Sequence, residues 1–237
     1  MTGPMYKRVL LKISGEAIGG EGCEVLGFDV IAQICGVIKR CLDAGVEMGI
    51  VIGGGNIWRG AKDGADKMDR TRADHMGMLA TTINCLALAD VLEKTGAEVR
   101  VQTAIEMRQL AEPYVRLRAA SHLSKGRAVV FGCGTGNPYF STDTAAVLRG
   151  AEIGADIVLL AKNVDGVYTA DPKTNPEAKK YEELTPGAFL RDNLAAMDAT
   201  AASLSRDNKI PVLLFALSDP ENIYRAIMGE KVGTLVR

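Results

Sequence analysis

The stretch MGIVIGGGNIWRG, residues 48–60, joins a short apolar run to three consecutive glycines. The run Met48–Ile52 is apolar almost throughout, which predicts a strand covered on both faces, as in a parallel sheet. Three glycines directly after a buried strand cost more conformational entropy than a tight turn requires. We therefore expect their N–H groups to form a nest for an anion such as phosphate, with the planar fork of Arg59 beside them. A flexible surface loop is the alternative.

Similar runs extend in both directions from this stretch and alternate with helical patterns. The other strand candidates are Arg8–Ile13, Glu98–Gln102, Ala128–Phe131, Ile157–Ala161 and Val212–Ala216. Four helices are expected. One has Asp29 as its cap and runs to Ala44, and a long one ends before Gly96. A third covers Asp143 to Ile153, and the last begins at Asp219-Pro220, as N-cap and first helical position, and stops at Gly229. This repetition predicts an α/β fold, a three-layer α/β/α sandwich with a mostly parallel central sheet. Residues 1–237 are expected to form one domain with two lobes, and the polar stretch Thr169–Thr185 is expected to be an excursion between them.

The composition limits the possible partners. Lys and Arg number 28 against 29 Asp and Glu, and this balance predicts no nucleic-acid partner and no anionic membrane partner. A phosphate ligand must then be met by a few placed cations and backbone donors. The five cysteines form no C-x-x-C pair, which favours a structural role for each of them in a reducing cytoplasm. No signal peptide or membrane-spanning run is expected.

In open α/β sheets, ligands bind beyond the carboxyl ends of the strands. Lys12 stands near such an end and is followed by Ser14-Gly15, a combination that suits phosphate. An edge lysine in contact with solvent is an equally good interpretation of Lys12 by itself. In Lys162–Pro172, Asp-Gly and Asp-Pro mark turns, and Tyr168 could flank a flat ring.

The loop Gly132–Pro138 is similar to the dinucleotide motif G-x-G-x-x-G, but Asn137 stands where the last glycine belongs. Because Pro138 disfavours a helical conformation at Asn137, the helix is expected to begin later, around Ser141–Asp143. Hydrogen bonding of a ligand by Thr, Asn and Ser side chains is the better interpretation. The chain contains no G-x-x-x-x-G-K-[ST] motif, so a P-loop phosphotransferase is excluded.

Six segments together carry a family resemblance: LLKISGEA, VIGGGNIWRG, ADHMGMLAT, GTGNPYFSTD, NVDGVYTADP and MGEKVGTLV. In this order and with this spacing, from about Tyr6 to Val236, the chain resembles the bacterial UMP kinases (uridylate kinases) of the amino-acid kinase superfamily. The resemblance implies transfer of the γ-phosphate of ATP to UMP, giving UDP and ADP in pyrimidine nucleotide biosynthesis. It also implies an N-terminal acceptor lobe, a C-terminal ATP lobe and a cytoplasmic homohexamer. The Met- and Leu-rich segment after Asp74 independently favours a homo-oligomer.

The resemblance further implies roles for individual residues. Lys12 and Asp198 would be catalytic, with Asp198 orienting the lysine. The implied ATP-binding residues are Lys12, Ile13, Ser14, Gly15, Gly55, Arg59, Lys162, Asn163, Tyr168 and Asp171. The implied UMP-binding residues are Gly54, Arg59, Asp74, Thr135, Gly136, Asn137, Pro138, Tyr139, Phe140, Ser141 and Thr142. Mg²⁺ would be held mainly by nucleotide phosphates, without protein ligands. GTP and UTP are possible effectors, and Gly19–Gly27, the segment least typical of the family, lies in the neighbourhood linked to control by GTP.

Three other functions compete with this one. The first is another amino-acid kinase, acting on a carboxylate or carbamate. The second is a nicotinamide-dependent oxidoreductase built on Gly132–Gly136, for which Asp156 stands at about the distance of the ribose-binding acid. The third is a nucleotide sensor without catalysis.

Overall fold

A single sheet of nine strands organises the part of the chain that the structure, a computed structural model, describes: residues 3–20, 24–59, 64, 67–172 and 174–237. The strand order is β4-β3-β5-β2-β1-β6-β8-β9-β7. All neighbouring strands are parallel except β8 and β9, which are antiparallel. The strands are β1 Arg8–Ile13, β2 Glu47–Ile52, β3 Val99–Thr103, β4 Glu112–Pro113, β5 Ala128–Gly132, β6 Ile157–Lys162, β7 Glu183–Leu184, β8 Val212–Ala216 and β9 Thr234–Val236.

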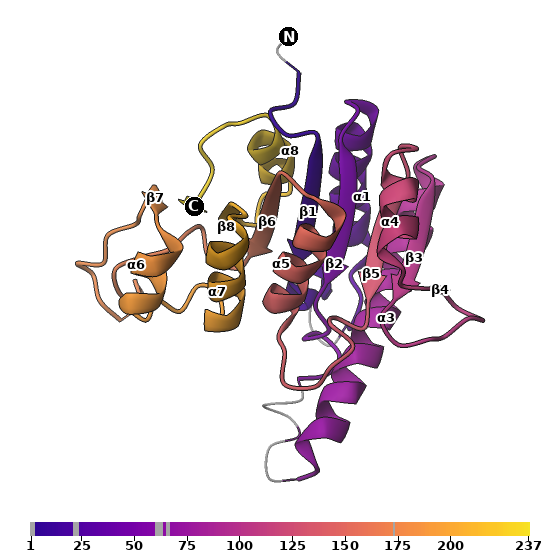
Figure 1. Cartoon of the computed structure of the whole chain (residues 1–237), viewed down its shortest axis with the longest axis horizontal. Helices are drawn as coiled ribbons and strands as arrows, with labels where there is room; N and C mark the ends of the chain where they lie inside the picture. Colours follow the sequence, from indigo (N-terminus) through magenta and orange to yellow (C-terminus); the bar gives the residue numbers. More distant parts are fainter. Residues whose placement is uncertain (1–2, 21–23, 60–63, 65–66, 173) are drawn as a thin grey trace.

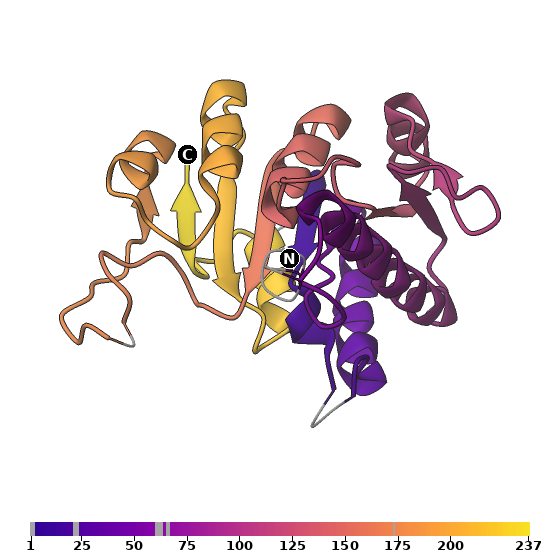
Figure 2. The ribbon, with the colours of Figure 1, turned by 90° about the horizontal axis from the view of Figure 1, so that it is seen from below.

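Helices cover both faces of the sheet (Figures 1 and 2). On one face, α1, α3 and α8 pack over a core that includes Leu11 and Ile50; on the other, α4, α5, α6 and α7 pack over Leu10 and Val129. This arrangement confirms the predicted three-layer sandwich. The helices are η1 Gly15–Ile18, α1 Phe28–Asp43, α3 Arg70–Lys94, α4 Arg116–Leu123, α5 Thr142–Ile153, α6 Pro186–Arg191, α7 Ala199–Asn208 and α8 Glu221–Ile227.

All six predicted strands are confirmed, with ends that differ by one residue at most. Two predicted helix starts are wrong. The N-cap of α1 is Gly27, and Asp29 lies in the first turn, where its charge suits the positive end of the helix. Helix α8 begins at Glu221, one residue later than expected, and the Asp219 carboxylate accepts a hydrogen bond from the Glu221 N–H at 3.0 Å.

Helix α3 is the one helix in the described residues that is long and apolar enough, by length and composition, to cross a membrane. Of its most apolar window, 56% is buried inside the fold, where Cys85, Leu88 and Leu92 join the core. The same test is passed by core helices of water-soluble proteins, and the burial of α3 matches that case.

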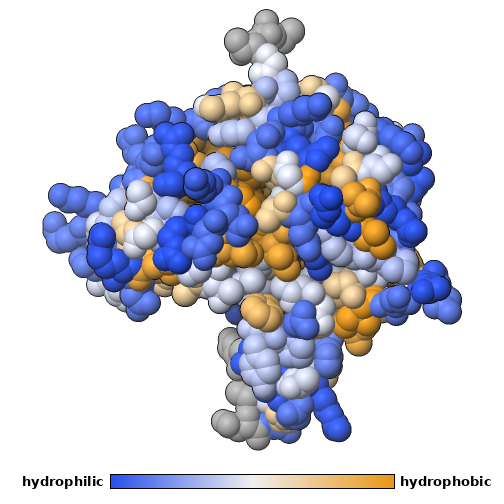
Figure 3. All heavy atoms as spheres, in the orientation of Figure 1, coloured by the Kyte–Doolittle hydropathy of each residue, from blue (hydrophilic) through white to orange (hydrophobic). Residues whose placement is uncertain are grey.

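The opposite side of α3 carries an exposed apolar stripe that consists of Met76, Leu79, Ile83 and Leu86. Their spacing of three and four residues places them along one side of the helix. The N-terminal turns of α3 extend beyond the sheet at the bottom of Figure 1. Figure 3 shows mostly hydrophilic side chains around the periphery of the face in view, with apolar ones gathered nearer its middle.

Cys35, Cys41, Cys85 and Cys133 are free and buried. Burial raises the pKa of both Cys35 and Cys41 to about 12, so these thiols remain protonated at neutral pH. The predicted structural role of Cys23 falls outside the described residues.

Candidate active site

Four adjacent strands, β5, β2, β1 and β6, end at the same edge of the sheet. All four are parallel, so the loops that follow them meet there. These loops are the four that the sequence analysis selected for their chemistry.

Two lysines and one carboxylate form the most buried charged cluster at this edge. Side chains alternate along a strand, so Lys12 shares the face of Leu10, and Lys162 that of Leu160, the face that α5 covers. Asp143, in the first turn of α5, lies between them. Its carboxylate is 3.0 Å from the Lys12 Nζ and also contacts the Lys162 Nζ. Lys12 is only 7% exposed, so the interpretation of Lys12 as a solvated edge residue is wrong.

The charges of this cluster depend on one another. Burial alone would raise the pKa of Asp143, but the Lys12 and Lys162 ammonium groups hold it below its usual range. Burial lowers the pKa of Lys162, the charge of Lys12 lowers it further, and Asp143 opposes both effects. Two ammonium groups therefore share the Asp143 carboxylate, and the charge of Asp198 also acts on Lys162.

In the described residues, the carboxylate that contacts Lys12 is that of Asp143, whereas Asp198 acts on Lys162 through its charge. The expected role of Asp198 in orienting the catalytic lysine stays a prediction. Asp198 is the N-cap of α7 and accepts a hydrogen bond from the Ala201 N–H at 2.9 Å. Its oxygens also bind the hydroxyls of Thr144 and Ser141, at the start of α5. Asp198 thus joins the beginnings of α5 and α7, and contributes to the placement of Asp143.

The glycine loop, residues 53–55, follows β2 and lies against two other elements. A Cβ on Gly15 would lie 2.4 Å from the Gly53 carbonyl oxygen, and a Cβ on Gly54 would lie 2.9 Å from both the Ala80 Cβ and the Gly77 oxygen on α3. Positive φ angles occur elsewhere in the chain but not at residues 53–55. Close approach to η1 and α3 is therefore what requires glycine at positions 15 and 54.

A cavity of about 480 Å³ opens beside this loop, a size that suits a small organic ligand. Nine of the expected UMP-binding residues line it: Gly54, Arg59, Asp74, Thr135, Asn137, Tyr139, Phe140, Ser141 and Thr142. Gly136 and Pro138 belong to the same loop but are not among the lining residues. The lining residues that the sequence analysis did not assign to this site are Gly55, Trp58, Arg70, Gly77, Met78, Thr81, Cys133 and Gly134.

Contacts between α3 and the loop after β5 border the cavity and involve Arg70, Asp74 and Tyr139. The Tyr139 N–H donates to Asp74 at 2.8 Å, and the Arg70 guanidinium donates to the same carboxylate at 2.9 Å. Arg70 also lies over the Tyr139 ring, 5.4 Å from its centroid. Arg70 and Asp74 thus form an ion pair within α3 that also takes part in a contact with a second element.

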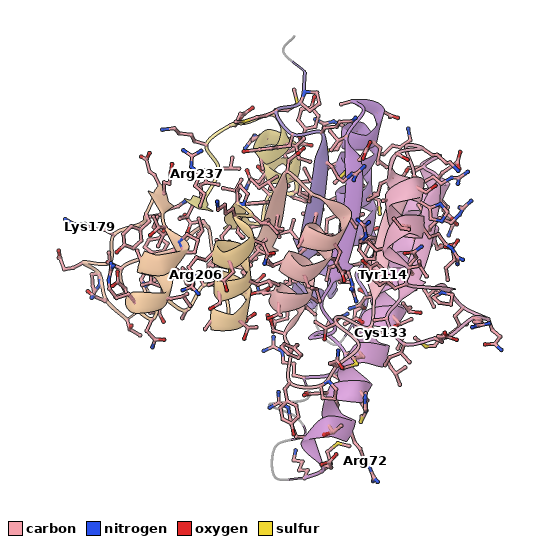
Figure 4. The ribbon with its side chains drawn as sticks, in the orientation of Figure 1. Arg72, Tyr114, Cys133, Lys179, Arg206 and Arg237 are labelled. Carbon is pink, nitrogen blue, oxygen red and sulfur yellow. The ribbon has the colours of Figure 1, made fainter. Side chains whose placement is uncertain are left out.

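Cys133, another residue that lines the cavity, also contacts α3. The Thr81 hydroxyl accepts a hydrogen bond from the Cys133 N–H at 2.9 Å, and the Thr82 hydroxyl lies 3.3 Å from the Cys133 Sγ. Figure 4 labels Cys133 beside α3, well above Arg72 near its beginning. The Thr135 hydroxyl accepts from the Asn137 N–H at 3.1 Å, which stabilises the turn between the two residues expected to contact the base.

The residues expected on the ATP side lie at the same edge, around β6. Ser14 donates its N–H to the Ala161 oxygen, next to Lys162. The Asn163 amide donates to Glu16 at 3.1 Å, and Glu16 also contacts Arg59. The Tyr168 hydroxyl donates to Asp165 at 2.9 Å, while Asp171 lies further along this loop. Ile13 is fully buried at the end of β1.

A comparison with known protein families matches residues 7–216 to the amino acid kinase family. The chain belongs to this family. Its structure is similar to that of a UMP kinase from Bacillus anthracis, with a TM-score of 0.94 and 44% identity over 98% of this chain and 96% of that one. A UMP kinase from Ureaplasma parvum gives a TM-score of 0.91 and 37% identity, covering 100% and 99% of the two chains. A uridylate kinase from Archaeoglobus fulgidus gives a TM-score of 0.75 and 30% identity over 97% of this chain and 99% of that one.

Two further observations concern metal ligands and the oxidoreductase alternative. No group of three or more His, Cys, Asp or Glu side chains in the described residues could hold a metal ion. Asp156 lies at the opposite edge of the sheet, where its carboxylate accepts hydrogen bonds from the N–H groups of Lys7 and Arg8 at 2.8 and 2.9 Å. Asp156 is therefore remote from Gly132–Gly136 and cannot bind the ribose of a dinucleotide held by that loop. This position argues against the oxidoreductase alternative.

Proposed function

We propose that this chain is a UMP kinase, which transfers the γ-phosphate of ATP to UMP and releases UDP and ADP. The observation that carries the proposal is its near full-length similarity to solved UMP kinases, at 44% and 37% identity. The position of the Lys12–Asp143–Lys162 cluster beside the cavity supports it. Phosphoryl transfer depends mainly on alignment and on neutralised charge, which this arrangement can supply.

UMP is the proposed occupant of the cavity. Arg59 and Gly54 lie on the wall formed by the glycine loop, where a guanidinium fork suits the phosphate of UMP. The Asp74 carboxylate can accept hydrogen bonds from ribose hydroxyls. Thr135 and Asn137 would face the uracil, with Gly136–Phe140 completing that wall.

The transferring phosphoryl group would lie between the cavity and the lysines. Ser141 and Thr142 line the cavity, and the next residue, Asp143, holds both lysines. Lys12 and Lys162 would neutralise the charge of the phosphoryl oxygens. Gly15 and Gly55 would approach the ATP phosphates, with Asn163, Tyr168 and Asp171 on the nucleoside side. Mg²⁺, held mainly by these phosphates and by water, would neutralise further charge.

We propose an acceptor lobe before β6 and an ATP lobe from β6 onward, in a cytoplasmic homohexamer that serves pyrimidine nucleotide biosynthesis without a nucleic-acid or membrane partner. GTP and UTP are proposed as effectors. Assays with and without each of them, at fixed ATP and UMP, test their effect on the rate.

The experiment that tests the function is a coupled ADP-release assay across UMP, CMP, dCMP, acetylglutamate and carbamate. We expect UMP to be preferred, because a site built for defined hydrogen bonds rejects an analogue that leaves buried groups unpaired, by up to ~10⁴-fold. Comparable kcat/KM for CMP and UMP would contradict this specificity. Preference for acetylglutamate or carbamate would favour the carboxylate-kinase alternative, and no turnover with any acceptor would favour a sensor.

A further inference from the structure

The glycine loop is attached along several turns of α3. The indole N–H of Trp58 donates to the Ala73 oxygen at 2.9 Å. One turn further along, Gly54 lies against Gly77 and Ala80, so closely that a Cβ would not fit. The next attachment along the helix is Asn84, which is fully buried. Helix α3 therefore serves as the support on which the loop after β2 rests.

The Asn84 side chain uses every hydrogen that it can donate. Its amide donates to the Gly53 carbonyl oxygen and to the Asn56 Oδ1, both at 2.7 Å. The Asn56 amide donates back to the Asn84 Oδ1 at 3.1 Å and also to the Val25 oxygen at 2.8 Å. The two amides thus form a reciprocal pair that joins three parts of the chain: α3, the glycine loop, and the segment that precedes α1.

We infer that Asn84 is a positioning residue for phosphoryl transfer. By holding Gly53 and Asn56 from both ends of the glycines, it sets the distance of Gly54 and Gly55 from the lysine cluster. Asn84 itself lies outside the residues that line the cavity, so it acts through the loop. This inference rests on the proposed function, because the loop is where the phosphates are expected.

A purely structural role for Asn84 makes a different prediction. A buried amide that only stabilises the fold would change the melting temperature when removed, and would leave the kinetics of the folded enzyme unaltered. A displaced phosphate loop instead lowers kcat below the melting transition, since a misplacement of about 1 Å can cost ~10²-fold in rate.

The test compares Asn84→Ala and Asn56→Ala with the wild type and with Cys35→Ala. Cys35 is a fair control because it is buried and its thiol contacts the Leu88 oxygen of α3, one turn beyond Asn84 and away from the loop. Trp58 is the only tryptophan in the chain, so its fluorescence reports directly on the loop. Asn56→Ala removes the same reciprocal hydrogen bonds from the Asn56 side, at a partly exposed position. This variant replaces Asn84→Ala in the test if Asn84→Ala does not fold.

We expect both asparagine variants to shift the Trp58 emission and to lower kcat, by about 10²-fold for Asn84→Ala and less for Asn56→Ala. Cys35→Ala should keep the wild-type emission and kcat even if its melting temperature falls. Folded asparagine variants with wild-type kcat, KM and emission would overturn the inference. If the wild type does not phosphorylate UMP, the proposed function fails, and the emission of the variants still decides whether Asn84 positions the loop.

Discussion

Lys12 is the residue whose replacement tests the chemistry most directly. It is buried beside Asp143 and Lys162, and a phosphoryl group placed there would meet a fixed positive charge. We expect Lys12→Ala to lower kcat by ~10²–10³-fold, far more than it raises either KM. Lys12→Arg should recover little, because a planar fork cannot replace a compact charge in a crowded site.

The measurement is steady-state kinetics on variants whose folding is checked by circular dichroism. Lys39→Ala, which removes a surface pair with Asp43 on α1, is the control and should retain full activity. Wild-type turnover by a well-folded Lys12→Ala variant would refute the catalytic role.

Asp143 should control stability as well as activity. Asp143→Asn removes the carboxylate that both lysines contact, and breaking a buried pair in this way costs about 3–5 kcal/mol. The loss should shrink at high pH. Burial lowers the pKa of Lys162, and loss of Asp143 would lower it further below the unfolded value of about 10.4. Between these two values the unfolded chain binds more protons, so the free energy of unfolding rises with pH.

Urea unfolding of the wild type and of Asp143→Asn at pH 7 and pH 9.5 measures this recovery. In the wild type, the lowered pKa of Asp143 gives a stabilisation that is present above about pH 3.9 and is lost as the pH falls through the folded value. An equal destabilisation by Asp143→Asn at both pH values would show that Asp143 does not hold Lys162 in its charged form.

The sequence allowed Lys12 to be predicted because a cation at the end of an apolar strand, before Ser14-Gly15, is unusual. Asp143 was missed as a site residue because an acid in the first turn of a helix is ordinary. Only the neighbouring positions of β1 and β6 in the sheet bring both lysines to it. The capping role of Asp198 at α7 was not predicted, since a capping acid and a catalytic acid look alike in sequence.

At the scale of elements, the fit between the glycine loop and α3 gives a prediction. A Cβ at position 54 would lie 2.9 Å from backbone and side-chain atoms of α3, and overpacking of this kind costs about 1–3 kcal/mol. We expect Gly54→Ala to lower both the free energy of unfolding and kcat/KM for UMP.

Gly36→Ala is the matched control, because it lies inside α1 and has no atom within 4 Å of an added Cβ. It should stabilise the protein by about 0.5–1 kcal/mol and leave activity unchanged. Thermal and urea unfolding with parallel kinetics measure both variants. A Gly54→Ala protein as stable and active as the wild type would show that the loop is free to move away from α3.

Strands long enough to form a clear apolar run were predictable from the sequence, and the shorter strands were not. The six predicted strands each have five or six residues, whereas β4, β7 and β9 have two or three. So few residues show no periodicity, and their pairing depends on neighbours distant in sequence. Helix α7 was missed for a similar reason, since its mixed sequence has a weak apolar side.

At the scale of the whole molecule, the exposed stripe of Met76, Leu79, Ile83 and Leu86 on α3 supports the proposed homo-oligomer. A second copy of the helix could cover it and remove apolar surface from water. We expect light scattering at micromolar concentration to give a mass well above that of one chain, with a hexamer as the proposed state. Ile83→Glu should lower this mass, because it places a charge in the covered stripe.

Lys39→Glu, on the surface of α1, also introduces a carboxylate, with an even larger charge change, but outside the stripe, and should leave the mass unaltered. A monomer mass for the wild type would contradict the assembly. An unchanged mass for Ile83→Glu would move the interface away from the stripe.

The central position of β1 has a consequence for synthesis on the ribosome. One neighbour, β2, follows it after α1, but the other, β6, begins only at Ile157, about 140 residues later. At ~5–20 residues per second, the nascent β1 waits roughly 7–30 s for its second partner. During that interval one edge of an apolar strand can pair with other chains. We therefore expect newly made chains to depend on chaperones until β6 has left the exit tunnel, and chains truncated at residue 150 to aggregate.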